Sequence, residues 1–414
     1  MERSDFELMA PAGSLEAMQA AFQGGADAVY FGVGHLNMRA HSARAFSTAD
    51  LPELAKRCRD HGVRSYLTVN TVLYDEDMPA LQALMDAAAS AGISAVIVAD
   101  VAAMLAARHA GLEVHLSTQL NIGNIAALKF YAQFADVAVL ARELTLAQVA
   151  HIHERVQSEP ILGPSGKPVR LEMFCHGAFC MAVSGRCWLS EASRGSSANR
   201  GECLQSCRRE YIVKDRERDI EFAVEDGHIF SPRDLKTIGF LDKMVAAGVR
   251  VFKIEGRARG PEYVRTVTAA YHEALCAIAE GHWAEAERSD WDTRLATVFN
   301  RGFWDGYYLG AKMPELTSGS GSQATERKVF AGECLDYYAK PAVGWFRLQS
   351  GELREGDTVL VTGPTTGAVR LRIEGLRVND REGKLARKGD EVTFRVPERV
   401  RAHDKLYRIE PAQR

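Results

Sequence analysis

Four cysteines close together in the sequence are the residues best suited to chemistry. Cys180, Cys187, Cys203 and Cys207 lie within 28 residues, on a polar segment rich in arginine, glycine and serine. Soft thiolates on an irregular loop suit an iron-sulfur cluster, because each iron takes one terminal thiolate. A zinc ribbon would normally carry two Cys-x-x-Cys knuckles, which this spacing lacks. A zinc site and four unrelated buried thiols stay as alternatives.

The other four cysteines have simpler interpretations. Cys58 and Cys276 fall in predicted helices and Cys334 begins a predicted β region, so each is expected to be a small core residue. Two roles are compatible with the position of Cys175. It could be a further cluster ligand, or a reactive thiol activated by the adjacent His176. Adjacent residues of a strand point to opposite faces, which argues against a pair between these two side chains.

Eight short apolar runs alternate with amphipathic helical stretches and would position these cysteines. Strands are expected at 6–11, 28–32, 65–70, 95–100, 113–117, 137–141, 169–174 and 249–254. Strands that are apolar on both faces and alternate with helices indicate a parallel sheet, and eight units in about 270 residues favour a TIM-like (β/α)8 barrel. The run PAGS at 11–14 lacks the glycine pattern of a dinucleotide fold.

Polar residues follow several of these strands, at the end where such barrels carry their chemistry. Glu172, His176 and Glu255 are candidate catalytic groups for proton transfer by position alone. The basic side chains expected nearest to the mouth are Arg39, Arg44, Arg142 and Lys253.

The chain divides into three predicted regions. The barrel covers 1–285 and includes the long insertion after the seventh strand, with its cysteine loop at 175–210 and a predicted helix start at Ser231. A connector with the flexible run TSGSGS covers 286–325, and short strands with turns indicate a small antiparallel β-barrel domain at 326–414. Residues 341–414 carry 15 basic and 11 acidic side chains, a balance of +4 that hints at RNA binding.

The composition limits the class of protein. The chain has 414 residues, of which 46% are hydrophobic and 25% charged, which excludes a disordered, collagen-like or coiled-coil architecture. The net charge of −3 gives no overall basic excess. Residues 1–6 lack the apolar core of a signal peptide, and the alanine-rich stretch 95–110 is interrupted by Asp100 and Arg108. We therefore expect a cytoplasmic protein with no membrane partner and with reduced cysteines.

Two neighbouring segments carry a spaced signature. Residues 172–180 read EMFCHGAFC and residues 185–190 read GRCWLS. This pattern resembles the signature of the U32 peptidase family, with Phe179 standing where the family has an aliphatic residue. The resemblance extends to MAPAG at 9–13, LSTQ at 116–119, SPRDL at 231–235 and KIEGR at 253–257.

The resemblance implies more than one activity. Some members of the family are called collagenase-like proteases, whereas others are RNA hydroxylases or ubiquinone-pathway hydroxylases with a 4Fe-4S cluster. The members most similar in layout are tRNA hydroxylation proteins that form 5-hydroxyuridine at the wobble position with prephenate. Carried over to this chain, the resemblance makes Cys180, Cys187, Cys203 and Cys207 the cluster ligands. The run GELREGDTV at 351–359 resembles the β-barrel second domain of translation GTPases.

The residues favour hydroxylation over proteolysis. No Gly-x-Ser-x-Gly elbow and no His-Glu-x-x-His helix is present, so a peptidase would depend on Cys and His alone. An unpaired wobble base, by contrast, can enter a barrel mouth at modest cost. The expected function is therefore an iron-sulfur RNA hydroxylase acting on tRNA, with a collagenase-like peptidase and a hydroxylase of ribosomal RNA as alternatives.

A dicarboxylate such as prephenate would need at least two cations to hold it. Arg142 and Lys253 are assigned to that anion, with Arg39 as a further substrate-binding residue. The alternative for Arg142 is an ion pair with Glu143, and for Lys253 an ion pair with Glu255. The sequence is compatible with a homo-oligomer and with a hetero-oligomer alike.

Overall fold

Eight parallel strands form a closed barrel in the computed structural model, which describes residues 1–40, 46–218, 220–222 and 228–412. The strands are β1 (Glu7–Pro11), β2 (Ala28–Phe31), β3 (Arg64–Val69), β4 (Ala95–Val98), β5 (Glu113–Leu116), β6 (Val137–Val139), β7 (Arg170–Gly177) and β11 (Val249–Ile254). The last strand, β11, pairs in parallel with both β1 and β7, which closes the ring. The predicted TIM-like barrel is confirmed.

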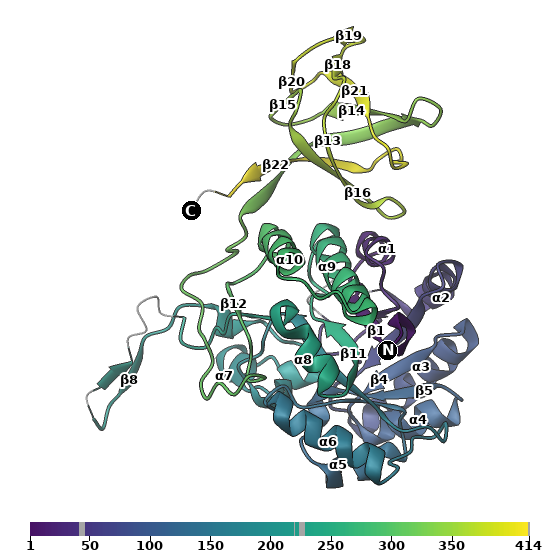
Figure 1. Cartoon of the computed structure of the whole chain (residues 1–414), viewed down its shortest axis with the longest axis vertical. Helices are drawn as coiled ribbons and strands as arrows, with labels where there is room; N and C mark the ends of the chain where they lie inside the picture. The colour runs from purple at the N-terminus through teal and green to yellow at the C-terminus, as the bar shows by residue number, and fades with distance from the viewer. Residues whose placement is uncertain (41–45, 219, 223–227, 413–414) are drawn as a thin grey trace.

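Helices surround the barrel, as expected for strands with two apolar faces (Figure 1). They are α1 (Leu15–Gln23), α2 (Leu51–Asp60), α3 (Met78–Ala91), α4 (Val101–His109), α5 (Ile125–Ala132), α6 (Leu146–Ser158), α8 (Leu241–Ala246) and α9 (Pro261–Glu280). The side chains of Ser14, Asp100, Asn124 and Thr145 accept a backbone N–H at the start of α1, α4, α5 and α6, respectively. These caps satisfy N–H groups that have no partner within the helix.

The insertion between β7 and α8 holds short elements instead of one helix. It includes α7 (Leu189–Arg194), the hairpin of β8 (Val213–Asp215) and β9 (Ile220–Phe222), and β10 (Asp234–Lys236), which pairs antiparallel with β7 and in parallel with β12 (Phe303–Trp304). The expected helix at Ser231 is wrong, because Pro232 pairs with Leu316 and strand β10 begins two residues later. A backbone partner across the chain therefore overrides the local capping pattern.

The region after α9 adds to the barrel body before the second domain begins. Helix α10 (Glu285–Thr297) packs on α9, and the Tyr308 hydroxyl donates to the Phe174 carbonyl oxygen at 2.9 Å. None of the described helices combines the length and the apolar character that crossing a membrane requires.

The C-terminal domain is an antiparallel β structure with its own apolar core. Its strands are β13 (Glu326–Tyr338), β14 (Val343–Leu348), β15 (Glu352–Arg354), β16 (Thr358–Gly363), β17 (Gly367–Arg372), β18 (Arg377–Val378), β19 (Arg381–Glu382), β20 (Leu385–Arg387), β21 (Glu391–Arg395) and β22 (Lys405–Pro411). The domain lies against α1 and α9 on the outside of the barrel (Figure 1), with β17 in contact with both helices.

Candidate active site

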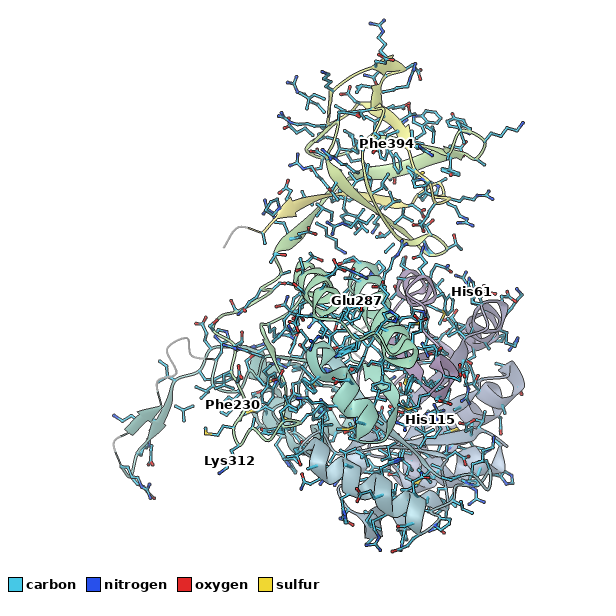
Figure 2. The ribbon with its side chains drawn as sticks, viewed as in Figure 1. His61, His115, Phe230, Glu287, Lys312 and Phe394 are labelled. Carbon is cyan, nitrogen blue, oxygen red and sulfur yellow. The ribbon has the colours of Figure 1, made fainter. Side chains whose placement is uncertain are left out.

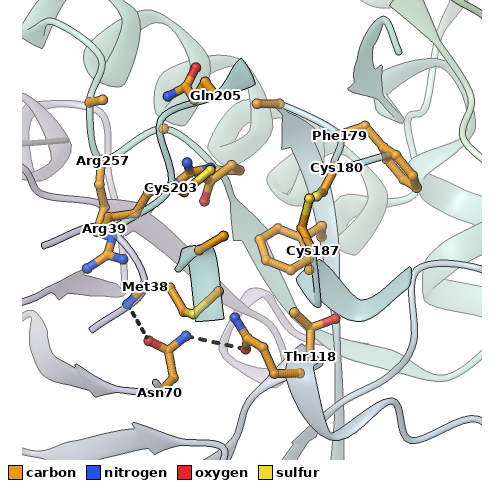
Figure 3. Close-up of a pocket in the computed structure, with 18 of the residues that line it drawn as sticks. Met38, Arg39, Asn70, Thr118, Phe179, Cys180, Cys187, Cys203, Gln205 and Arg257 are labelled. Carbon is orange, nitrogen blue, oxygen red and sulfur yellow. Dashed lines mark hydrogen bonds and ion pairs between the residues drawn. The ribbon is translucent and has the colours of Figure 1, made fainter. Parts of the chain in front are cut away.

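One cavity lies at the C-terminal ends of the barrel strands, under the cysteine insertion. Strand ends contribute Asn70, Arg142, Phe174, Lys253 and Glu255, and the insertion contributes the four predicted ligand cysteines. Figure 3 shows part of this lining, with Cys180, Cys187 and Cys203 near Arg39 and Asn70. The structure therefore brings the cysteines to the barrel end where the sequence predicted chemistry.

The four thiols are close enough to influence one another. Burial raises the pKa of Cys187 and of Cys207, and the charges of the neighbouring cysteines raise both pKa values further. The donor set suits an iron-sulfur cluster, which takes one thiolate for each iron. In the parts of the chain that the structure describes, however, no three Cys, His, Asp or Glu side chains are grouped tightly enough to hold a metal ion.

Asn199 ties the cysteine segment to the barrel. Its side-chain oxygen accepts from the backbone N–H of Cys187 at 3.3 Å, and its backbone carbonyl accepts from the N–H of Val72 at 3.0 Å. Arg200 donates to the Asp77 carboxylate and to the Val72 carbonyl oxygen. These contacts hold the irregular segment against the loop that follows β3.

The cavity is strongly basic. Its described lining includes seven cationic side chains and a single carboxylate, that of Glu255. The cations are Arg39, Arg142, Arg208, Lys253, Arg257, Arg259 and Arg301. Such a lining favours an anionic ligand, provided that some of these charges lack a partner within the protein.

Most of these cations already have protein partners. Arg257 donates to Asn37 and Thr68 at 3.0 and 2.8 Å, and Arg208 donates to the carbonyl oxygens of Phe179 and Pro232 at 2.6 and 2.8 Å. Arg301 forms an ion pair with Asp234 at 3.3 Å, and Arg259 lies 4.0 Å from the same carboxyl group. These four side chains are therefore held in place.

Arg142 differs from the others, because its guanidinium is buried without a hydrogen-bond partner among the described residues. The residue is 7% exposed, and Nε is buried and unpaired. The group lies over the rings of Phe174 and Phe179, 5.3 and 5.0 Å from their centroids. No ion pair joins it to Glu143, whose carboxylate instead accepts from the Ser184 N–H at 3.3 Å. The alternative of an Arg142–Glu143 pair therefore does not hold among the described contacts.

Lys253 has an ion-pair partner in the protein, but this partner is not Glu255, the alternative that the sequence left open. Its Nζ lies 2.9 Å from Oε1 of Glu172, and both side chains are buried. Glu172 thus neutralises Lys253 beneath the cavity and does not line it. The charge that remains for a ligand is mainly that of Arg142.

Glu255 is ionised within the basic lining. Burial would raise the pKa of this carboxyl, but the charges of Arg39 and Arg257 and a hydrogen bond from Tyr30 outweigh burial and lower it. The Arg39 Nη2 atom lies 3.3 Å from Oε1, and the Tyr30 hydroxyl donates to Oε2 at 3.0 Å. As a carboxylate, Glu255 can accept a hydrogen bond from a polar ligand at the cavity wall.

The structure does not bring His176 into the cavity. This residue is 1% exposed and packs against the rings of Tyr263, Tyr271 and Phe303. Burial, followed by the charges of Lys236 and Arg259, lowers the pKa of His176 to about 3, so the ring is neutral.

Cys175 lies in the core beside His176. Its thiol donates to the Lys253 carbonyl oxygen at 3.4 Å, and burial raises its pKa well above the ordinary value. The β7–β11 register shifts between Phe174 and His176, so Cys175 is the extra residue of a bulge. A buried protonated thiol of this kind is a poor nucleophile.

Sequence reasoning missed Arg208, Arg259 and Arg301 as cavity residues. Arg301 follows α10 and Arg259 lies beyond the last strand, and no local motif marks either as part of the mouth. Arg44 lies outside the described residues.

Comparison with known proteins identifies the family. The sequence profile of peptidase family U32 matches residues 13–318. The chain belongs to this family.

Relatives in the family carry different names. A Porphyromonas gingivalis protein named "Collagenase" is 55% identical over 410 residues, with 99% of each chain covered. The Bacillus subtilis "tRNA hydroxylation protein P1" is 32% identical over 375 residues, covering 86% of this chain and 83% of that protein. The Escherichia coli "23S rRNA 5-hydroxycytidine C2501 synthase" is 34% identical over 319 residues, covering 75% of this chain and 46% of that enzyme.

Proposed function

We propose that this protein is an RNA hydroxylase that forms 5-hydroxyuridine at the wobble position of tRNA, with a dicarboxylate of the prephenate type as co-substrate. The observation that carries the proposal is a single cavity with four cysteines and the buried, unpartnered guanidinium of Arg142. The names of the tRNA- and rRNA-modifying relatives support RNA as the substrate class. A hydroxylase of ribosomal RNA would use the same cavity.

Cys180, Cys187, Cys203 and Cys207 would hold a 4Fe-4S cluster. When bound, the cluster supplies electron transfer beside the substrate. The sulfurs around such a cluster lie farther apart than the ligands of a single metal ion, so the cavity-lining positions of the four thiols suit a cluster better than a mononuclear site.

The remaining lining offers groups for both substrates. Arg142 would bind one carboxylate of the anion, and Arg39, which lines the same cavity, would bind the other. Asn70 Nδ2 donates to Gln119 Oε1 at 3.3 Å, which leaves Gln119 Nε2 to donate to the edge of a uracil. An unpaired loop base can be turned into such a cavity at modest cost.

Mass spectrometry of tRNA nucleosides, with and without the gene, tests this function. We expect 5-hydroxyuridine and its derivatives to disappear from tRNA on deletion and to return with the wild-type gene. Unchanged tRNA and ribosomal RNA nucleosides would contradict the proposal. Loss of a hydroxylated nucleoside from ribosomal RNA alone would assign the other substrate.

Anaerobic purification tests the cluster separately. The protein should be brown, with iron and sulfide in about equal amounts, and each of Cys180→Ser, Cys187→Ser, Cys203→Ser and Cys207→Ser should lower the iron content. Cys58→Ser is the matched control, because Cys58 lies buried in α2 away from the cavity. Colourless wild-type protein that holds zinc would exclude the cluster.

A peptidase is the second candidate, because a 55% identical relative is named "Collagenase". The state of Cys175 opposes this function, since its thiol is fully buried and protonated and no hydrogen bond to His176 is found among the described contacts. A peptidase of this type would lose activity on denatured collagen with Cys175→Ala and keep it with Cys203→Ala. Equal inactivity of the wild-type protein and both variants would dismiss it.

A further inference from the structure

An exposed rim of apolar side chains stands beside the cavity. We call Val72, Tyr74, Trp188 and Leu204 the Trp188 rim, and their exposed fractions are 44%, 55%, 71% and 44%. Trp188 follows Cys187, which lines the cavity, and it is the most exposed tryptophan of the chain. Its indole makes no ring contact with any described residue, whereas Trp283, Trp291 and Trp304 make edge-on or tilted contacts with other rings.

Hydrogen bonds fasten this rim to the barrel. Asn199 bonds the backbone of Cys187 on one side and the N–H of Val72 on the other. The Leu204 N–H donates to the Ser190 hydroxyl at 3.1 Å, which joins the other end of the cysteine segment to α7. The backbone that carries Trp188 is thus held in place, although its side chain is exposed.

The two aromatic rings of the rim are not equivalent. The guanidinium of Arg200 covers the Tyr74 ring, with its central carbon 4.4 Å from the ring centroid. Asp75 and Glu76 follow Tyr74 and are exposed, so the electrostatic potential near Tyr74 is less favourable to a polyanion. Trp188 alone of the two offers an uncovered aromatic face.

The charge of the segment that carries Trp188 is positive. Residues 186–209 contain five arginines and two glutamates. Arg186 and Arg194 are exposed on either side of Trp188, with Glu191 the exposed acid between them. An exposed aromatic face among cations is the usual arrangement for single-stranded nucleic acid, because bases stack on the ring while phosphates meet the arginines. A protein partner would not require this positive charge.

We propose that Trp188 is a stacking platform for an unpaired nucleotide next to the base that enters the cavity. The platform rests on the proposed function, since it assumes an RNA loop at the barrel mouth. It would hold the neighbouring base outside while the target base passes Cys187 into the cavity.

Binding of a uridine-containing RNA stem-loop to the full-length protein tests the platform. Trp188→Leu keeps an apolar side chain but removes the aromatic face, and we expect its dissociation constant to rise about tenfold. Trp188→Phe should stay within about threefold of wild type, because a smaller aromatic face remains. Phe130→Ala is the matched control, since Phe130 is an exposed aromatic residue on α5.

Fluorescence gives a readout that a structural role would not change. The wild-type protein should lose emission when the stem-loop is added, and this quenching should be absent from Trp188→Phe. A fully paired RNA duplex of the same composition should quench little.

Three results would overturn the platform. In the first, Trp188→Leu binds the stem-loop as tightly as the wild-type protein does. In the second, the duplex quenches the fluorescence as strongly as the stem-loop does. In the third, the substitution changes self-association of the protein and not RNA binding. Its failure is separable from that of the hydroxylation proposal. If tRNA keeps its hydroxyuridine in Trp188→Leu cells and binding is unchanged, the platform alone fails. If deletion of the gene leaves RNA nucleosides unchanged while Trp188 still stacks on RNA, the hydroxylation alone fails.

Discussion

Arg142 and Lys253 are both buried cations at the barrel mouth, but only Lys253 forms an ion pair within the protein. Lys253 is neutralised by Glu172 at 2.9 Å, whereas Arg142 lies over two phenylalanine rings and forms no ion pair or hydrogen bond among the described contacts. A buried charge without a counter-ion is costly, and its desolvation is offset when a ligand of opposite charge binds. The sequence predicts that both residues lie at strand ends. It does not predict which carboxylate each one contacts, because that depends on side-chain geometry across the barrel.

Arg142→Met separates ligand binding from stability. Formation of the hydroxylated nucleoside should fall at least about tenfold, because a charge-assisted contact to the anion is lost. The free energy of unfolding should stay within about 1 kcal/mol of wild type or rise, because an unpaired buried cation is replaced by an apolar chain. Nucleoside mass spectrometry and urea unfolding measure the two effects. Arg108→Met on α4 is the control, and a large loss of stability in Arg142→Met would show that the guanidinium has a structural role.

Glu172→Gln should lower the free energy of unfolding, in contrast to Arg142→Met. Removal of this carboxylate leaves the Lys253 ammonium buried without its counter-ion, which costs about 3–5 kcal/mol. Glu172→Gln combined with Lys253→Met should recover most of that loss, because neither buried charge then remains. Urea unfolding of the single and double variants gives the answer. A double variant no more stable than the single one would mean that the pair does not act as a unit.

At the scale of elements, the two ends of the barrel strands carry different kinds of charge. The C-terminal ends line the basic cavity, whereas the N-terminal ends carry paired charges. Arg64 at the start of β3 lies 2.6 Å from Glu113 at the start of β5, and Arg170 at the start of β7 lies 2.9 Å from Glu7. The N-terminal end is suited to stability, and the C-terminal end, where Arg142 has no ion pair among the described contacts, is suited to ligand binding.

Glu113 makes the stability of this paired end depend on pH. Burial would raise its pKa, but interactions with His115 and Arg64 lower it to about 2 from an ordinary 4.5. The folded protein therefore gains stability above about pH 4.5 and loses it as the pH falls toward 2. Glu113→Gln should remove on the order of 2–3 kcal/mol at pH 6 and much less at pH 3, measured by urea unfolding. A loss of stability that is the same at both pH values would contradict this account.

At the scale of elements, much of the fold could be predicted from the sequence, but only part of the candidate site could. Alternation of apolar runs and helices located all eight barrel strands, because strands buried on both faces have a strong local pattern. The expected helix at Ser231 was wrong, since its local capping pattern is overridden by the pairing of Pro232 with Leu316, 84 positions away. The burial of His176 and the inclusion of Arg301 in the cavity likewise depend on packing that no local spacing encodes.

At the scale of the whole molecule, the C-terminal domain docks on the first helix of the barrel. The Gln23 side chain at the end of α1 donates to the Thr366 carbonyl oxygen at 2.9 Å and accepts from the Ala368 N–H at 3.0 Å. Arg265 on α9 forms an ion pair with Glu398 at 3.0 Å. The outline of the molecule with its side chains shows the two bodies meeting along this edge (Figure 2). The basic domain is therefore held at a set distance from the cavity.

Gly367→Ala should loosen this docking. An added Cβ would lie 2.2 Å from the Gln23 side-chain oxygen, so Gln23 would have to move and lose its three hydrogen bonds to the C-terminal domain. We expect the interaction between the C-terminal domain and the barrel to weaken by about 1–3 kcal/mol. Faster proteolysis of the 317–322 segment and separate melting of the two domains would show this weakening. Gly389→Ala is the matched control, because Gly389 also has a left-handed φ but open space around it. Similar behaviour of both variants would assign the effect to backbone strain alone.

The place of the cysteine insertion in the chain has a consequence for biosynthesis. All four thiols precede β11, the strand that closes the barrel by pairing with β1 and β7. During translation they leave the ribosome while the sheet is still open, and the C-terminal domain that docks on α1 follows later. The thiols are therefore open to solvent on the nascent chain, before the cavity exists.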